Sequence, residues 1–163
     1  MSEDNLTIWL AGPDDLDEVM ALAMLACEDN ALTNPNPLKL LQDIWPALNR
    51  DSGLLAAIGE PGGRMEGIIL LRISEMWYSD DLILDEKAIF IHPDYRQAAG
   101  GRARRLAAFA KKTSDTLGIP LVIGVLSNQR TAAKVRMYSR EFGPPSGAYW
   151  IYNGSTGSSI TSE

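Results

Sequence analysis

The stretch AIFIHPDYRQAAGGRARRLAAFAKKTSDTL, residues 88–117, decides the fold. Its first four residues, 88–91, are an apolar run of the kind found in strands. Pro93 disfavours helix at the residue before it, and Asp94 favours a turn. Residues 102–117 then place apolar side chains at helical spacing. The stretch is therefore predicted to fold as strand, turn, loop and long helix.

The loop at residues 96–101 has the features of an anion-binding site. Its small side chains allow a ligand to approach the backbone closely. The free N–H groups of the following helix carry roughly half a positive charge and attract phosphate. Four arginines add formal charge nearby: Arg96, Arg102, Arg104 and Arg105. A Gly-Gly pair between a strand and a helix is also common as a plain connection, so the loop alone leaves both interpretations open.

These residues resemble the pyrophosphate-binding motif of the GNAT superfamily of N-acetyltransferases, Arg/Gln-x-x-Gly-x-Gly/Ala after a strand and a turn. Residues 91–96 are similar to the strand end and turn, and 101–103 (Gly-Arg-Ala) are similar to Gly-x-Gly/Ala. Ala98 stands where the motif has Arg or Gln, and the loop is longer than the motif. The resemblance implies acetyl-CoA (coenzyme A) as co-substrate.

The rest of the chain is predicted to alternate in the same way. Expected strands are 6–10, 54–58, 65–75, 82–91, 121–126 and 148–152, and expected helices are 16–27, 38–48, 102–117 and 129–142. Pro46 predicts a kink or break in the second helix. We expect one domain, 1–153, followed by a disordered Gly/Ser/Thr tail at 154–163.

This order of elements is the GNAT order, and the resemblance covers residues 6–153. It implies an α/β (α+β) fold with a mixed, mostly antiparallel sheet of six to seven strands flanked by about four helices. The chain departs from most members in having one clear strand, rather than two, after the last helix.

Composition restricts the partners. The 163 residues include 15 Lys and Arg against 21 Asp and Glu, a net charge of −6. This balance disfavours nucleic acid and favours cationic partners such as amines. Cys27, the only cysteine, excludes an internal disulfide and fits a reducing compartment. The start of the chain is unlike a signal peptide, and no apolar run reaches membrane-spanning length. We expect a cytoplasmic protein without membrane contact, and leave a homodimer open.

Acetyl transfer to an amine requires a neutral amine and a protonated leaving thiolate. An aliphatic amine has a pKa near ~10.4, so a base must remove its proton. Glu86, on the fourth expected strand, is our candidate base, and alternation would place it on the same face as Ala88 and Phe90. Residues 135–140 look like the GNAT helix motif that carries a catalytic tyrosine, which makes Tyr138 the candidate acid. A solvated acid and a core tyrosine are the competing interpretations.

The resemblance also implies which residues contact coenzyme A. The backbone of the fourth strand would pair with the pantetheine arm, and Asn128 is similar to the family's asparagine at that arm, although it also fits a helix N-cap. The full predicted set is Ile89, Phe90, Ile91, Arg96, Gln97, Ala98, Ala99, Gly100, Gly101, Arg102, Ala103 and Asn128. No cluster of side chains has metal-ligand spacing, so no metal is expected.

The acceptor site is predicted on the connection between the third and fourth strands. Its acids would gather a cationic small-molecule or peptide amine, and its aromatic faces would hold the ammonium group. The predicted residues are Glu75, Tyr78, Asp80 and Asp81. A solvated hairpin tip explains the same residues equally well.

The leading interpretation is therefore an acetyl-CoA-dependent N-acetyltransferase of primary amines, acting by direct attack. The alternative is a catalytically weak or inactive GNAT-fold module that binds coenzyme A or a partner. A third interpretation, modification of nucleic-acid bases, is disfavoured by the acidic balance.

Overall fold

The computed structural model describes residues 5–30, 32–126 and 130–152. Asn128 and the predicted tail at 154–163 lie outside these ranges. The elements in chain order are β1 (Thr7–Leu10), the 3-10 turn η2 (Pro13–Asp15), α1 (Leu16–Asn30), α2 (Pro37–Leu48), β2 (Gly53–Gly59), β3 (Gly67–Glu75), β4 (Leu82–Ile91), the 3-10 turn η3 (Pro93–Tyr95), α3 (Arg102–Leu117), β5 (Leu121–Val122) and α4 (Thr131–Phe142). Within the described part, no helix combines the length and the apolar character needed to cross a bilayer.

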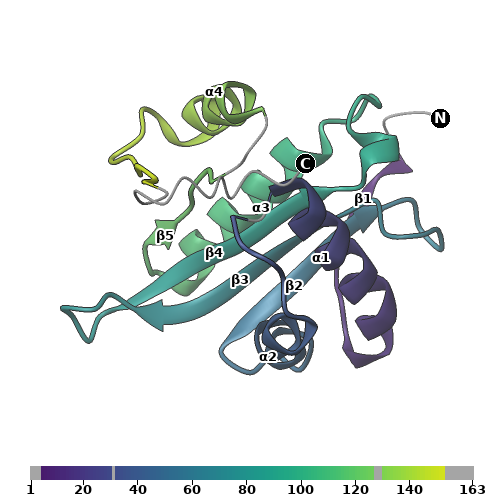
Figure 1. Cartoon of the computed structure of the whole chain (residues 1–163), viewed down its shortest axis with the longest axis horizontal. Coiled ribbons are helices and arrows are strands. Elements are labelled where there is room, and N and C mark those ends of the chain that lie inside the picture. Colours follow the sequence, from purple (N-terminus) through teal and green to yellow (C-terminus); the bar gives the residue numbers. More distant parts are fainter. Residues whose placement is uncertain (1–4, 31, 127–129, 153–163) are drawn as a thin grey trace.

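The sheet has the strand order β1-β2-β3-β4-β5. The first three pairings are antiparallel, and β5 joins β4 in parallel after the α3 crossover. Helices α1 and α2 lie on one face and α3 on the other, with α4 beyond α3 and β5 (Figure 1). This arrangement confirms the predicted α/β class, the mostly antiparallel sheet and the four helices.

Two apolar cores lie on the two faces of the sheet. Alternate residues of β2 and β3 enter each core: Leu55 and Leu70 pack with α1 and α2, whereas Ala56 and Leu71 pack with Leu106 of α3. Because both faces are covered, these strands read as continuous apolar runs in the sequence. Strand β4, which carries predicted site residues, lies next to these buried central strands.

The caps explain why two helices begin and end as the sequence predicts. The Asn36 side chain accepts a hydrogen bond from the Leu38 N–H at 2.9 Å, which satisfies a free donor at the start of α2. Glycines in the left-handed region bound α3, with φ of 57° at Gly101 and 67° at Gly118. Pro46 does not break α2, which continues to Leu48.

Strand β4 contains a β-bulge at Lys87. Leu70 and Leu71 are consecutive in β3, yet they pair with Ala88 and Glu86. Residues that pair across neighbouring strands point to the same face of the sheet. Leu70 faces α1 and α2, so its partner Ala88 does too, whereas Leu71 and its partner Glu86 face α3. The expectation that Glu86 shares a face with Ala88 and Phe90 is therefore wrong.

The sheet is smaller than predicted at its β5 edge. The described residues form five strands, not six to seven. Strand β5 has two residues instead of the six expected at 121–126, and 148–152 form no strand. Tyr149, Trp150 and Tyr152 are more than 80% exposed. An alternating segment forms a strand only where it can pair with a free sheet edge and bury one of its faces. The two-residue β5 is too short to provide such an edge.

Candidate functional site

A cavity of about 280 Å³ lies where the predicted anion loop meets α4. One wall comes from the end of β4, the loop after it and the first turn of α3, and the other comes from α4. Eight predicted coenzyme residues line it: Ile89, Phe90, Ile91, Arg96, Ala98, Gly101, Arg102 and Ala103. Gln97, Ala99 and Gly100 are not among the lining residues, and Asn128 lies outside the described residues.

Arg96 is held in place at the cavity wall. Its guanidinium donates a hydrogen bond to the Ile91 carbonyl at 3.0 Å and forms an ion pair with Asp29 at the end of α1. It also lies over the Phe90 ring, 5.1 Å from the ring centroid. The cation is thus fixed in orientation, and Asp29 is a carboxylate that an incoming anion would have to compete with.

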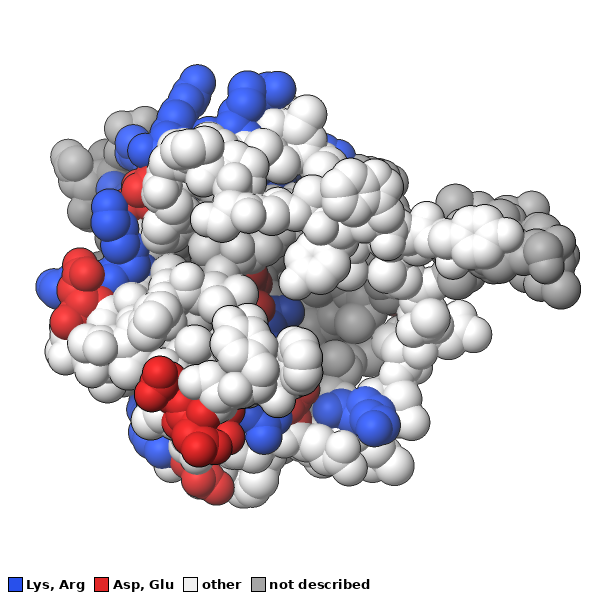
Figure 2. Space-filling view, turned by 90° about the vertical axis from the view of Figure 1, so that its left-hand side faces the viewer, with Lys and Arg blue, Asp and Glu red and all other residues white. Residues whose placement is uncertain are grey.

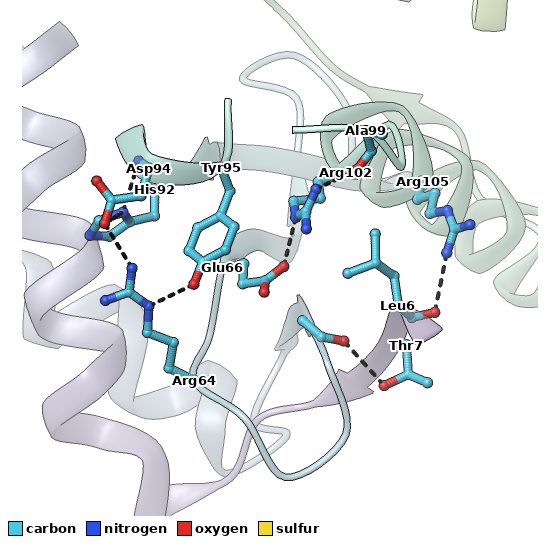
Figure 3. Close-up of polar contacts among 11 residues, drawn as sticks. Leu6, Thr7, Arg64, Glu66, His92, Asp94, Tyr95, Ala99, Arg102 and Arg105 are labelled. Carbon is cyan, nitrogen blue, oxygen red and sulfur yellow. Dashed lines mark hydrogen bonds and ion pairs between the residues drawn. The ribbon is translucent and has the colours of Figure 1, made fainter. Parts of the chain in front are cut away.

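Arg102 belongs to the packing of the loop. Its Nε donates to Glu66 Oε2 at 2.6 Å, and both side chains are only 4% exposed. Its Nη1 donates to the Ala99 carbonyl at 2.8 Å, and its guanidinium lies over the Tyr95 ring (Figure 3). The charge of Arg102 is therefore neutralised by Glu66. A ligand would meet the backbone of Arg102 in the first turn of α3 rather than an unpaired cation.

The other side of the loop packs against the N-terminal strand. Arg105 donates to the Leu6 carbonyl at 3.1 Å (Figure 3). Gly100 has a φ of 112°, which side chains rarely adopt, and a Cβ there would also lie 2.5 Å from a Leu6 methyl group, so the position favours glycine. The four arginines thus do not act alike: Arg96, Arg102 and Arg104 line the cavity, although Arg96 and Arg102 are each paired with a carboxylate, whereas Arg105 is not a lining residue and binds the Leu6 carbonyl.

Tyr138 and Glu86, the candidate acid and base, are neighbours on the α3 face. Tyr138 lines the cavity and is 8% exposed, and its hydroxyl has no hydrogen-bond partner among the described residues. Burial, and secondarily the charge of Glu86, raise the pKa of Tyr138. Burial raises the pKa of Glu86 to about 7, against a hydrogen bond from the Gly124 N–H at 3.4 Å. A carboxyl group that titrates near neutral pH is suited to accept a proton.

Seven lining residues are not in the predicted site set: Asp29, Tyr95, Arg104, Arg130, Ala133, Lys134 and Met137. Four of them share one side of α4 with Tyr138 at spacings of three and four residues, a pattern that was available in the sequence. Asp29 has no such signal, because its place at the cavity depends on how α1 crosses the sheet.

The predicted acceptor residues lie elsewhere. Glu75, Tyr78, Asp80 and Asp81 are all exposed, and none lines the cavity. Their hairpin projects at the far left of Figure 1, at the opposite end of β4 from the anion loop, about 30 Å away for ten extended residues. Figure 2 views this side and shows acidic side chains gathered on its lower part. The acceptor role of the hairpin stays a prediction.

Among the described residues, no group of three or more His, Cys, Asp or Glu side chains is arranged to hold a metal ion. His92 instead accepts a hydrogen bond from the Asp94 N–H at 3.2 Å. The cavity is therefore lined by cations, the Asp29 carboxylate and the buried Tyr138 hydroxyl, whereas Glu86 does not line it and is linked to it only as a charged neighbour of Tyr138.

No family model and no curated protein matches this sequence. Solved structures share its fold. An aminoglycoside acetyltransferase from an uncultured soil metagenomic sample is 14% identical over 93% of this chain and 95% of its own, with a TM-score of 0.63. The ribosomal-protein-alanine N-acetyltransferase of Brucella melitensis biovar Abortus 2308 is 16% identical over 91% and 99%, with a TM-score of 0.63. A GNAT family acetyltransferase of Staphylococcus aureus is 18% identical over 74% and 88%, with a TM-score of 0.54. The chain therefore has the GNAT acetyltransferase fold, as residues 88–117 predict.

Proposed function

We propose that this protein is an N-acetyltransferase that moves an acetyl group from acetyl-CoA to a primary amine by direct attack. One observation carries the proposal: a single cavity joins a cationic loop at the start of α3 to the buried hydroxyl of Tyr138, which has no partner among the described residues. A buried polar atom without a partner is costly, and a ligand that accepts its proton would remove that cost. The shared fold supports the same class of reaction.

Each end of the cavity fits one end of acetyl-CoA. The loop and Arg96, which line the cavity, would bind the phosphates through N–H groups and a fixed cation, and the backbone of 89–91 would pair with an extended arm. The coenzyme supplies an acetyl thioester, whose carbonyl carbon is open to attack. The protein residues then hold the arm, exclude water and move protons.

Glu86 and Tyr138 would move those protons in opposite directions. As the amine nitrogen bonds to the carbonyl carbon and the carbon–sulfur bond breaks, Glu86 accepts the amine proton, directly or through water. Tyr138 donates its hydroxyl proton to the departing sulfur and is reprotonated from solvent afterwards. Because its pKa is raised, Tyr138 holds its proton at every pH at which Glu86 changes charge.

The conservative substitution Tyr138→Phe tests this assignment, because it removes the donor and keeps the ring. We expect kcat to fall by about 100-fold or more, as for loss of a general acid, with the Kd for acetyl-CoA unchanged. Tyr149→Phe makes the same chemical change on an exposed ring outside the cavity and should have no effect. Equal kcat values in wild type and Tyr138→Phe would remove Tyr138 from the mechanism.

The acceptor is best sought with a panel of amines and detection of released thiol. The structural neighbours include enzymes named for aminoglycosides and for a ribosomal-protein alanine, so the panel contains an aminoglycoside, a peptide with N-terminal alanine and small diamines. Calorimetry with acetyl-CoA precedes it, with Arg96→Glu compared with Arg136→Glu on the exposed side of α4. Binding without turnover on any amine would favour the binding-module alternative.

A further inference from the structure

Helix α4 brings cations to the cavity from the side opposite the anion loop. Arg130, at the N-terminal boundary of α4, and Lys134, one turn into it, both line the cavity. Arg96 and Arg104 line the loop side. Among the described lining residues Asp29 is the one acid, and it is ion-paired with Arg96. With Arg102, which is paired with Glu66, the cavity therefore gathers five cations in a protein whose net charge is −6.

These cations are close enough to affect one another. Lys134 is half-buried, and its pKa is lowered by burial first, then by the charge of Arg96, and also by that of Arg130. Glu86 and Asp29 act in the opposite direction but do not outweigh those effects. Like charges held together in a partly buried place destabilise one another unless an anion joins them. Their combined charge favours an anionic ligand in the cavity.

Spacing along α4 relates this charge to the reactive end of the site. Lys134 and Tyr138 are one turn apart, about 6 Å along the axis, and both face the cavity. A linear ligand lying along this side of α4 would meet cations first and the Tyr138 hydroxyl next. That order matches a molecule with phosphates at one end and a thioester at the other.

We infer that Arg130 and Lys134 form the second wall of a phosphate clamp, holding the phosphates of coenzyme A opposite Arg96. The inference rests on the proposed function for the identity of the ligand. Under this proposal the loop forms one wall of the phosphate site and α4 forms the other. Arg102, which the motif places at the phosphates, supports the loop through Glu66, and α4 supplies cations in its stead.

Calorimetry with three ligands tests the clamp. Coenzyme A carries a 3′-phosphate and a diphosphate, dephospho-coenzyme A keeps only the diphosphate, and pantetheine has neither. We expect Lys134→Met and Arg130→Met each to weaken coenzyme A binding by about 10- to 100-fold, the range of one charge-assisted hydrogen bond. Pantetheine binding should be equal in wild type and variants. Arg136→Met, which removes the same charge from the exposed side of α4, should change Kd less than twofold.

Each result has a defined meaning. A loss confined to coenzyme A assigns the clamp to the 3′-phosphate, and a loss shared with dephospho-coenzyme A assigns it to the diphosphate. Wild-type affinity for coenzyme A in both variants, or an equal loss for pantetheine, overturns the clamp while the proposed function stands. Failure of the wild-type protein to bind coenzyme A overturns both. Thermal unfolding of each variant shows that it is folded, and Lys134→Arg should retain affinity if charge is what matters.

Discussion

Removing Glu66 should destabilise the fold strongly, because it leaves Arg102 charged inside the protein. The two side chains are 4% exposed and 2.6 Å apart. In Glu66→Ala the guanidinium keeps the Ala99 carbonyl and the Tyr95 ring, neither of which carries a formal charge. Loss of one partner of a buried pair costs about 3–5 kcal/mol. For a domain of this size, that corresponds to a fall in Tm of about 6–20 °C.

Urea unfolding at pH 7, followed by circular dichroism, measures this effect. The control is Asp94→Asn, which breaks the exposed Arg64–Asp94 pair near the same loop and should cost less than about 1 kcal/mol. The double variant Glu66→Met with Arg102→Met removes both charges and should recover most of the loss. A Glu66→Ala protein within about 1 kcal/mol of wild type would refute the reasoning, since the pair would then contribute no more than an exposed one.

Two further predictions concern pH and backbone conformation. The folded pKa of Glu86, about 7, lies above its ordinary value of 4.5, so its stabilising contribution is complete below pH 4.5 and is lost as pH rises to 7. Glu86→Gln should therefore gain stability relative to wild type over that interval, by up to about 3 kcal/mol, and parallel urea-derived stability curves from pH 4 to 8 would contradict this. Gly118→Ala should cost about 1 kcal/mol in the same assay, because φ is 67° and no atom lies within 4 Å of the added Cβ; an unchanged free energy of unfolding would show that the strain is relieved elsewhere.

The parts of the fold that depend on local chemistry were predictable from the sequence. The apolar runs of β2 and β3 and the periodicity of α3 report burial directly, and the glycine that follows α3 marks its end. The pairing of distant segments was not predictable in the same way. Residues 148–152 alternate as a strand should, yet pairing requires a free edge, and β5 provides two residues of it.

The same division holds for the site. The anion loop and Tyr138 carry local motifs, and the structure brings both to one cavity. The roles of the individual arginines carry no such signal, because they depend on partners from distant parts of the chain: Asp29 for Arg96 and Glu66 for Arg102. A count of charges near the loop therefore overstated its cationic strength and overlooked α4.

The bulge at Lys87 decides whether Glu86 can take part in the chemistry at all. With regular alternation, Glu86 would share a face with Ala88 and Phe90, and Phe90 belongs to the core beneath α1 and α2. The extra residue moves Glu86 to the face of Leu71, where it is half-buried and interacts with Tyr138 and Lys134. Burial and, less, the charge of Asp85 favour the neutral acid, whereas the hydrogen bond from the Gly124 N–H and the charges of Lys134 and Lys87 favour the carboxylate. Burial is the largest of these effects and brings the pKa to about 7, so the proposed role of Glu86 as a base at neutral pH depends on one inserted residue in β4.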